Sequence, residues 1–425
     1  MSAAAPLETA AAAPPLDAAT RARGRRLAVA SHPAGMTFRT VFTEWLPTLA
    51  LVGLGGSPAL VGLQSAFDPL GHFLQLGVLR AVGRWSKRRI LLAGQVLAIV
   101  AALPLLAYGT LQSEPGALAL GIAVASFAAV AAGIAISDTV WFPLLRSYVE
   151  PGAVGRFFGT IRSVWHLTLI VYFLAARVWV ERHPGALGPL FAVGLGAGVL
   201  RLGLVARMPE RSERTGRPIR AREALALLRT HARLRRYLVG VGAQGALWTA
   251  TLPFVIVMMR RALGMSDAQV IGATVAAYAG GLVSLYPWGR AVDALGPARV
   301  FRWCSLGLAA SFAALLLVRE PGAFAIAALT GFFFVANVLR AGFGVADTHV
   351  LFGLAPEDAP ASLIVVATAV TFLPRAAAPL LVGVALDAIL ARGVDPLGAY
   401  HGLFLAAAAL QAAVFVPLRR FGATP

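Results

Sequence analysis

Long apolar segments separated by short polar loops run along the chain from about residue 37 to residue 418. Each segment contains roughly 20 residues or more, which is the length that an α-helix needs to cross a hydrocarbon core of about 30 Å. The pattern therefore predicts an all-α polytopic membrane protein with twelve transmembrane helices. The predicted limits are 37–56, 57–80, 88–111, 116–142, 157–180, 186–207, 236–260, 268–290, 298–318, 322–352, 361–391 and 397–418.

Four short patterns in the first half of the chain return in the second half, in the same order and at a nearly constant offset. Their matched starting positions are Gly55 and Gly264 (264 − 55 = 209), Arg80 and Arg290 (290 − 80 = 210), Glu114 and Glu320 (320 − 114 = 206), and Asp138 and Asp347 (347 − 138 = 209). Four ordered matches indicate an internal duplication, and hence two pseudo-symmetric six-helix bundles. Such repeats are typical of secondary transporters, whose substrate site lies between the repeats.

Composition supports a membrane protein and excludes several other classes. The chain is 58% hydrophobic and 13% charged, whereas about 25% of residues are charged in soluble domains. The net charge is +18, but the arginines lie between apolar segments and form no basic face with interleaved aromatic residues, so we expect no nucleic-acid partner. Cys304 is the only cysteine, which excludes a disulfide framework and a cysteine-based metal site. No cofactor and no metal are predicted.

Four parts of the chain follow from these patterns. They are a disordered, Ala/Pro-rich cytoplasmic tail (1–35), a first six-helix bundle (36–207), a basic cytoplasmic linker (208–235) and a second six-helix bundle (236–420). Arginines crowd the linker, and Leu225, Leu228 and Leu234 give its second part an apolar edge. This pattern predicts an amphipathic helix that lies on anionic lipids at the inner membrane face. A regulatory docking site is the alternative interpretation of the linker.

Basic residues mark the loops on one side of the predicted membrane. They lie between spans 2 and 3, 4 and 5, and 8 and 9, and after span 12: Arg84, Lys87, Arg88, Arg89, Arg146, Arg156, Arg299, Arg302, Arg419 and Arg420. All of these positions fall on one side if both termini are cytoplasmic, and cytoplasmic loops carry an excess of Lys and Arg. We therefore expect a multi-pass protein of the cell (inner) membrane with both termini in the cytoplasm.

The loops after spans 2 and 8 resemble the loop motif of the major facilitator superfamily, Gly-x-x-x-Asp-Arg-x-Gly-Arg-Arg. The second copy contains Gly289, Asp293 and Gly296. The first copy has Leu79, Gly83 and Ser86 at these positions and keeps the basic ones with Arg84, Lys87 and Arg88. The resemblance covers about residues 36–420 by topology and does not identify a subfamily or a substrate. It implies two bundles that rock around a central site, and a protein that works as a monomer.

Charged residues near these loops are candidates for a gate. The predicted gating residues are Arg80, Arg84, Asp138, Arg290, Asp293 and Asp347. Asp138 and Asp347 are expected near the cytoplasmic ends of spans 4 and 10, at the depth of the loop arginines. We expect the two signs to pair and to stabilise the cytoplasm-closed state. Static ion pairs without a gating role are the alternative.

One face of span 2 carries four polar residues, Gln64, Asp68, His72 and Gln75, because residues three or four apart share a helix face. Asp68 is expected near the bilayer midplane, where a carboxylate costs about 2.5–3.5 kcal/mol and needs a cavity or a partner. His72 is one turn away and can share its proton, so the face predicts a proton or cation coupling site. A structural Asp–His pair is the alternative. Acidic residues on spans 2 and 4 are also similar to the cation site of the glycoside–cation symporters; Asp68 matches this pattern in kind, whereas Asp138 is expected too near the cytoplasm.

Further polar and aromatic residues inside the spans are candidates for a substrate cavity: Glu44, His166, Trp248, Tyr278, Asn337, Arg340 and Arg375. Glu44 is expected at a depth similar to that of Arg162 and His166, which are one turn apart, so these residues can pair; a structural role is the alternative. The planar guanidinium groups of Arg340 and Arg375 match a carboxylate or phosphate of a substrate, and the alternative is snorkelling or inter-helix contact. The rings of the tryptophan and the tyrosine can stack on a substrate ring, or they face the core or lipid.

These observations favour a secondary active transporter that moves a small solute, of unknown identity, by alternating access and with proton coupling. The alternative is a non-transporting sensor or scaffold, or a lipid translocator, with the same fold. We expect that the protein is not an enzyme, because the sequence lacks a nucleophile elbow, a phosphate-binding glycine loop and a Cys/His dyad. Membrane lipids are the other expected partners.

Overall fold

The computed structural model describes residues 16–82, 85–149, 154–210, 231–354 and 360–421, and the regular secondary structure within these ranges is entirely helical. The first half contains α1 (Ala18–Thr43), α2 (Trp45–Gly53), α3 (Pro58–Val82), α4 (Lys87–Ala102), η1 (Leu103–Ala107), α5 (Tyr108–Ser113), α6 (Ala117–Arg146), α7 (Val154–Arg182) and α8 (Gly188–Ala206). The second half contains α10 (Ala232–Val257), η3 (Met258–Ala262), α11 (Asp267–Leu295), α12 (Pro297–Ala314), η4 (Leu315–Leu317), α13 (Ala323–Leu354), α14 (Pro360–Leu390) and α15 (Pro396–Ala413).

These helices form twelve rods, six in each half of the described chain. Four rods consist of consecutive helices, namely α1 with α2, α4 with η1 and α5, α10 with η3, and α12 with η4. Apart from the first rod, the limits lie within about five residues of the predicted ones. The predicted all-α fold with two sets of six long helices is therefore confirmed for the described ranges.

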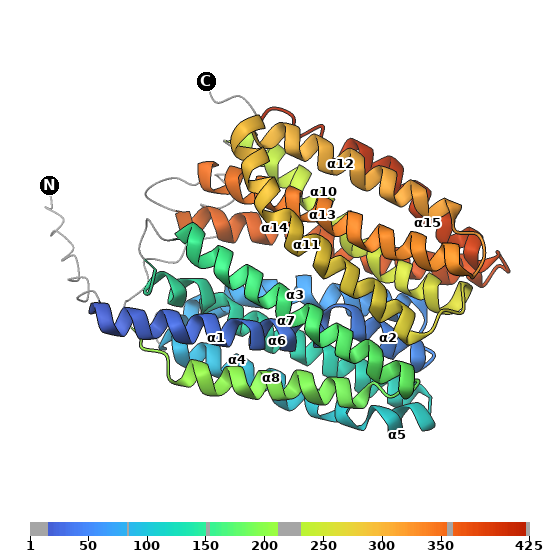
Figure 1. The fold of residues 1–425 in the computed structure, drawn as a ribbon, viewed down its shortest axis with the longest axis horizontal. Helices are drawn as coiled ribbons and strands as arrows, with labels where there is room; N and C mark the ends of the chain where they lie inside the picture. Colours follow the sequence, from blue (N-terminus) through green and yellow to red (C-terminus); the bar gives the residue numbers. More distant parts are fainter. Residues whose placement is uncertain (1–15, 83–84, 150–153, 211–230, 355–359, 422–425) are drawn as a thin grey trace, which may run out of the picture.

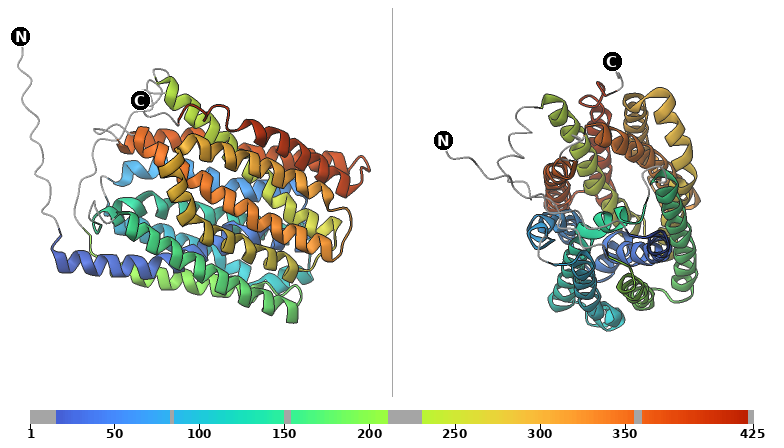
Figure 2. Two further views of the ribbon diagram at one scale, coloured as in Figure 1. Left: turned by 45° about the horizontal axis from the view of Figure 1, so that its top comes forward. Right: turned by 90° about the vertical axis from the view of Figure 1, so that its left-hand side faces the viewer.

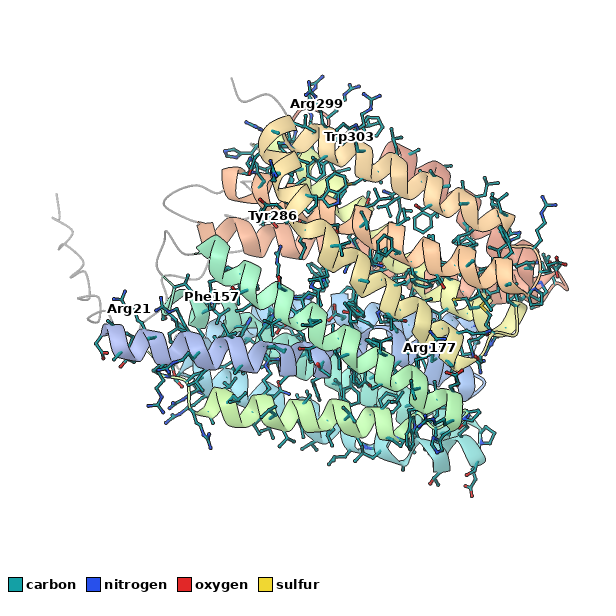
Figure 3. All side chains as sticks on the ribbon, in the orientation of Figure 1. Arg21, Phe157, Arg177, Tyr286, Arg299 and Trp303 are labelled. Atoms are coloured by element: carbon teal, nitrogen blue, oxygen red, sulfur yellow. The ribbon has the colours of Figure 1, made fainter. Side chains whose placement is uncertain are left out.

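The outer surface of the molecule is suited to lipid. Nine of the helices in the described ranges are long and apolar enough to cross a membrane. Large apolar side chains point outward, among them Tyr286, which is 75% exposed, and Trp303, which is 48% exposed (Figure 3). Removing such side chains from water is favourable, and a bilayer provides the apolar surroundings. The chain is therefore a multi-pass membrane protein.

The first rod begins earlier than predicted. α1 starts at Ala18, and the carboxylate of Asp17 caps it by accepting a hydrogen bond from the backbone N–H of Thr20 at 2.8 Å. The prediction of a disordered tail over residues 1–35 is therefore wrong for residues 18–35, because alanine and arginine are strong helix formers and Ala28 is buried in the bundle. Residues 1–15 and 211–230 lie outside the described ranges, so the predicted amphipathic helix of the linker stays a prediction.

The two halves form two bundles that lie side by side. In Figure 1, α1, α4, α6, α7 and α8 make up the lower part of the molecule, and α10, α12, α13 and α15 make up the upper part; the end-on view of Figure 2 shows the same division. Two helix pairs join the halves, because α3 packs along α14 and α7 packs along α11. The repeat relates the two pairs to each other, since α3 corresponds to α11 and α7 to α14.

Equivalent turns confirm that the sequence repeat is a structural one. Gly55 and Gly264 follow the first rod of each half, with φ angles of 80° and 60°. Residues with a side chain rarely adopt this left-handed conformation, so both turns require glycine. The two glycines were matched in the sequence at an offset of 209 residues.

The two halves share a hydrophobic core at one end of the molecule. We call this the distal end; there, residues 54–57 and 263–266 connect the first two rods of each half. The opposite end, at which the described part of the chain begins and ends, is the terminal end. One core cluster contains residues of both halves, such as Trp45 and Phe333. Toward the terminal end each half has its own cluster, around Tyr148 and around Phe301.

Candidate functional site

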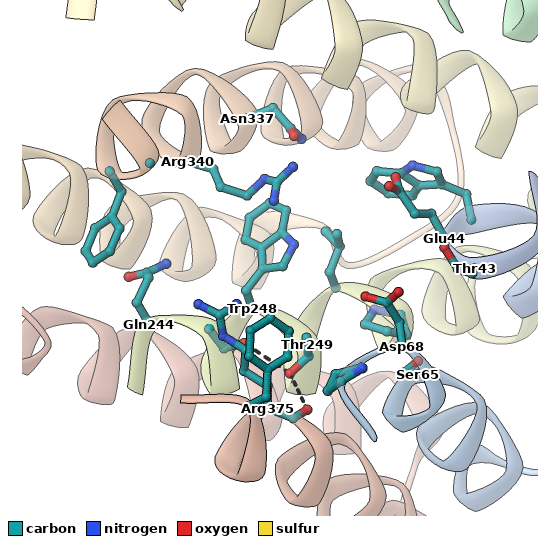
Figure 4. Close-up of a pocket in the computed structure, with 18 of the residues that line it drawn as sticks. Thr43, Glu44, Ser65, Asp68, Gln244, Trp248, Thr249, Asn337, Arg340 and Arg375 are labelled. Atoms are coloured by element: carbon teal, nitrogen blue, oxygen red, sulfur yellow. Dashed lines mark hydrogen bonds between the residues drawn. The ribbon is translucent and has the colours of Figure 1, made fainter. Parts of the chain in front are cut away.

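A cavity of about 440 Å³ lies between the two halves (Figure 4). Its walls come from α1, α2 and α3 in the first half and from α10, α11, α13 and α14 in the second half. Seven of the predicted site residues line it: Glu44, Asp68, Trp248, Tyr278, Asn337, Arg340 and Arg375. Asp347, which was predicted as a gating residue, lines it as well. The volume is in the range of small-molecule binding sites.

Arg39 on α1 holds carboxylates from two other helices. One of its guanidinium nitrogens donates to Asp68 on α3 at 2.5 Å, and another donates to Asp138 on α6. The three side chains are only 21%, 31% and 25% exposed. A charge in such surroundings depends on its partners, because removing one partner leaves the other charge uncompensated. The two-sided contact also needs the planar fork of an arginine.

Asp138 therefore lies close to Asp68, which corrects the prediction that it is too far toward the cytoplasm. The shared contact with Arg39 brings acidic residues of spans 2 and 4 into one cluster. Arg201 on α8 lies within electrostatic range of Asp138, and its guanidinium stands 5.2 Å from the ring centroid of Trp141. Four helices of the first half contribute to this cluster of charges.

The polar face of span 2 contacts different neighbours along its length. Gln64 accepts a hydrogen bond from the hydroxyl of Thr48 on α2 at 3.4 Å, and Gln75 donates to a backbone carbonyl of α6 at 3.3 Å. The ring of His72 lies 4.0 Å from that of Phe372 on α14, and its Nδ1 is buried without a hydrogen-bond partner among the described residues. Of the four predicted coupling residues, Asp68 lines the cavity. The contacts of Gln64 and Gln75 are those of helix packing.

The wall of the second half carries two arginines. The guanidinium carbon of Arg340 on α13 lies 5.1 Å from the ring centroid of Trp248, and that of Arg375 on α14 lies 4.8 Å from that of Phe372. Figure 4 shows both guanidinium groups on the side of the cavity that faces Asp68 and Glu44. This wall is therefore basic and aromatic.

The predicted pairing of Asp138 and Asp347 with Arg290 is wrong. Their hydrogen-bond donors are Arg39 and Tyr237, the latter at 2.5 Å from Asp347. Arg290 is exposed near the end of α11 and lies over a ring of its own helix. The aspartates point into the bundles, whereas this arginine points to the surface. Of the remaining predicted gating residues, Asp293 is exposed. The side chains of Arg80 and Arg84 are outside the part of the structure that is described.

Tyr278 on α11 joins the two halves on the distal side of the cavity. Its hydroxyl donates to Glu44 at 2.7 Å and accepts from the indole N–H of Trp45 at 3.0 Å. Its ring stacks on Phe173 with 5.5 Å between centroids, and the ring of Trp45 meets Phe333 edge-on at 5.1 Å. We call these five residues the aromatic latch. Glu44, Trp45 and Tyr278 of the latch line the cavity, so the latch joins the two halves at the cavity wall.

A second set of contacts joins the halves beyond the latch. The carboxylate of Asp387 on α14 accepts from the hydroxyl of Ser57 at 2.7 Å and from the backbone N–H of Ala59 at 3.0 Å. It thereby caps the first turn of α3 from the other half of the molecule. Arg261 donates to the carbonyl of Gly56 at 2.6 Å. Charged groups of the second half thus bind the same turn of the first half.

His166 was predicted to line the cavity and does not. Its Nδ1 lies 2.8 Å from the backbone carbonyl of Arg162, and its ring centroid lies 6.4 Å from that of Tyr278. The side chain is 8% exposed and stands behind the latch. The predicted pairing of Glu44 with His166 is also wrong, because Tyr278 is the partner of Glu44.

We predict that Tyr278→Phe destabilises the closed distal end. The variant keeps the ring contacts but leaves the Glu44 carboxylate and the Trp45 N–H without their shared partner. Trp45 is buried, and an unsatisfied buried group costs about 1–3 kcal/mol. The melting temperature of the detergent-purified protein measures this effect. Tyr286→Phe, on the same helix but 75% exposed, is the matched control. Equal melting temperatures of the two variants would contradict the role of the hydroxyl.

Comparison with known proteins identifies the fold. No family model matches the sequence, and no curated protein matches it. Solved structures do: a point mutant of the nucleoside transporter NupG superposes with a TM-score of 0.70 at 11% identity, covering 93% of this chain and 99% of that chain. The chain has the fold of the major facilitator superfamily, which is the fold that the loop motif implied.

Two further transporters show the same fold. A bacterial homologue of the iron transporter ferroportin in an inward-facing state gives a TM-score of 0.67 at 17% identity, covering 95% of this chain and 99% of that chain. In its outward-facing state the score is 0.58, at 17% identity, with 92% and 98% covered. A bacterial homologue of the human lysosomal transporter Spinster, inward-facing and unoccupied, gives 0.67 at 14% identity, with 96% and 100% covered. These neighbours are described as transporters or as homologues of transporters.

Sequence reasoning missed several residues of the site. Arg39 was not considered, although an ionisable residue inside an apolar span is a functional candidate by default. Arg201 is likewise an ionisable residue within an apolar span, span 6, and was not considered either. Gln244 on α10 lines the cavity and accepts a hydrogen bond from Gln411 at 2.5 Å. A list of every ionisable or amide side chain within the spans would have included all of them.

Proposed function

We propose that the protein is a secondary active transporter that moves a small solute across the membrane by alternating access, coupled to protons. The observation that carries the proposal is a charged cavity between two repeat-related bundles, joined by a latch at the distal end and with separate cores at the terminal end. Alternating access requires such a site at the interface of two bundles that rock against each other. The transporters that share the fold support this function.

We place the terminal end in the cytoplasm and the protein in the inner membrane. The loops at the terminal end carry the excess of arginine and lysine, which favours the cytoplasmic side. In this orientation the latch is extracytoplasmic and the cavity faces inward. The similarity to the ferroportin homologue supports a cavity that faces inward, because the TM-score is 0.67 for its inward-facing state and 0.58 for its outward-facing state.

Asp68 is the proposed coupling carboxylate. The charged and titratable groups that face it are Arg39 from α1, His72 from its own helix and Arg375 from α14. When Asp68 takes up a proton it releases Arg39, but Arg39 keeps its contact with Asp138. The guanidinium is therefore never left without a carboxylate. Release of Asp68 loosens α3 from α1, which links protonation to a movement of helices within the bundle.

We predict that Asp68→Asn abolishes accumulation driven by a pH gradient and spares exchange of substrate, because the amide cannot take up the proton but still fits the cavity. Proteoliposomes loaded with one labelled solute measure both activities, as uptake driven by an imposed gradient and as counterflow. Asp293→Asn, which changes an exposed carboxylate outside the cavity, is the control and should behave as the unmodified protein. Driven accumulation that persists in Asp68→Asn would make Asp68 structural.

The substrate is found first by a screen of solutes in the same vesicles. Sugars, organic anions, amino acids, peptides and drugs are tested for counterflow, which needs a moving carrier but no driving ion. Counterflow of any soluble compound supports the transporter. Its absence for the whole panel would favour the lipid-handling or non-transporting alternative.

A further inference from the structure

Arg340 is an accessible cation on the wall of the cavity. Its side chain is exposed to the cavity, and its contact among the described residues is with the ring of Trp248 at 5.1 Å. No carboxylate of the described residues lies within salt-bridge distance of it. An arginine that meets only an aromatic ring retains all five N–H donors for another group.

Arg375 stands beside it with an incomplete set of partners. Its Nε is buried and has no hydrogen-bond partner among the described residues. Arg340 and Arg375 lie within electrostatic range of each other. Asp347 is also within range of Arg375, but the hydrogen bond that this carboxylate accepts comes from Tyr237. Two neighbouring cations in a poorly solvated cavity repel each other, and an anion between them removes that repulsion.

The acidic residues of the cavity already have donors. Asp68 is bound by Arg39, and Glu44 is bound by Tyr278. Asp68 is therefore paired with a cation, and Glu44 and Asp347 accept hydrogen bonds from neutral tyrosine hydroxyls. Among the described residues, Arg340 and Arg375 have no carboxylate within salt-bridge distance. The acidic groups of the cavity therefore have hydrogen-bond donors, whereas the two guanidinium groups retain donors for a ligand.

We propose that the cavity binds a small organic anion, whose carboxylate or phosphate group is held by Arg340 and Arg375. The inference rests on the proposed function, because it names the substrate class of that transporter. A guanidinium fork matches either anion through two parallel hydrogen bonds. Trp248 and Phe372 provide aromatic surface for the body of the ligand beside the two guanidinium groups. A volume of about 440 Å³ accommodates a body of small-molecule size.

Gly245 shows that the chain is built to admit Arg375 to this position. A Cβ at Gly245 on α10 would collide with the Arg375 side chain, including its guanidinium carbon at 2.6 Å. One turn earlier, a Cβ at Gly242 would meet its nearest neighbour at an ordinary 3.5 Å. The glycine therefore leaves the space through which the guanidinium passes along the cavity wall.

The test is equilibrium binding to the purified, full-length protein. Benzoate and phenyl phosphate are the anionic probes, and benzamide is the neutral probe of matched shape. The melting temperature of the protein measures binding, since a ligand that binds the native state raises it. We expect a shift with at least one of the two anions and none with benzamide. The anion that acts distinguishes a carboxylate site from a phosphate site. Equal shifts with all three probes, or no shift with either anion, would overturn the proposal.

Substitutions locate the effect. Arg340→Gln and Arg375→Gln should each weaken binding of the active anion by tenfold or more, and Arg290→Gln, which changes an exposed arginine outside the cavity, should leave it unchanged. Gly245→Ala should weaken binding by displacing Arg375, whereas Gly242→Ala should not. Anion binding that survives in both cavity variants places the ligand elsewhere and overturns the assignment.

Binding and transport separate the two proposals. Anion binding that depends on Arg340, without counterflow in vesicles, supports the site and contradicts the transporter. Counterflow of neutral or cationic solutes alone supports the transporter and contradicts the anion site.

Discussion

Arg39→Gln should abolish transport and lower the stability of the protein more than any other single change in the cavity. The glutamine removes the cation that holds Asp68 and Asp138 together, and two carboxylates are left facing each other in a poorly solvated site. Removing one partner of a buried ion pair costs about 3–5 kcal/mol, and the exposed fraction of these side chains places the effect near the lower limit. The melting temperature and counterflow measure the two losses.

Charge-balanced variants distinguish this explanation from a packing defect. Arg39→Gln combined with Asp68→Asn and Asp138→Asn removes all three charges, and should recover much of the stability but not the driven transport. Arg39→Lys keeps the charge but lacks the two-sided fork, so it should be intermediate in stability. A neutral triple variant that is no more stable than Arg39→Gln would show that the cost lies in packing and not in charge.

The sequence predicted the helices well because the membrane imposes their length. A span needs about 20 apolar residues, and polar loops end it sharply. The repeat then predicted the two bundles, and the loop motif predicted the fold. The start of the first rod was the exception, because the residues before position 37 are polar enough to be mistaken for a solvated tail. In the structure, α1 begins at Ala18 and runs beside the bundle.

That error explains why the central ion pair was missed. With a span that begins at 37, Arg39 is the third residue and belongs to a membrane edge; in the structure it is the twenty-second residue of a helix that begins at Ala18. Arg39 and Thr43 therefore line the cavity and do not lie at the edge of the membrane. Asp138 was placed too near the cytoplasm for another reason: it lies about 20 residues into span 4, but α6 continues to Arg146. Pairing between helices distant in sequence depends on packing, which periodicity does not contain.

Cavity residues were predicted better than their partners. A charged or amide side chain inside a span is expensive, so Asp68, Asn337, Arg340 and Arg375 were recognised from their type and depth alone. Which direction each one faces is decided by its neighbours. His166 is also an ionisable residue within a span, but it does not line the cavity; its Nδ1 lies at the backbone carbonyl of Arg162 and its ring lies 6.4 Å from that of Tyr278.

α3 and α14 cross closely at the distal end. A Cβ at Gly62 would collide with the backbone carbonyl of Pro379, and a Cβ at Gly383 would lie 2.5 Å from the backbone oxygen of Pro58. Backbone atoms cannot turn aside as a flexible side chain can. The two glycines therefore allow the helices of opposite halves to approach at the distal end, where the Asp387 cap then forms.

Gly62→Ala should hold the distal end open, because overpacking costs about 1–3 kcal/mol and moving the halves apart relieves it. A Ser65→Cys probe in the cavity, in a Cys304→Ser background that has no other cysteine, reports opening by its reaction with an impermeant maleimide from the extracytoplasmic side. We expect labelling to rise several-fold in Gly62→Ala. Gly77→Ala on the same helix, where a Cβ meets nothing within 4 Å, should label as the background does. A folded Gly62→Ala protein with unchanged labelling would show that this crossing does not control the distal closure.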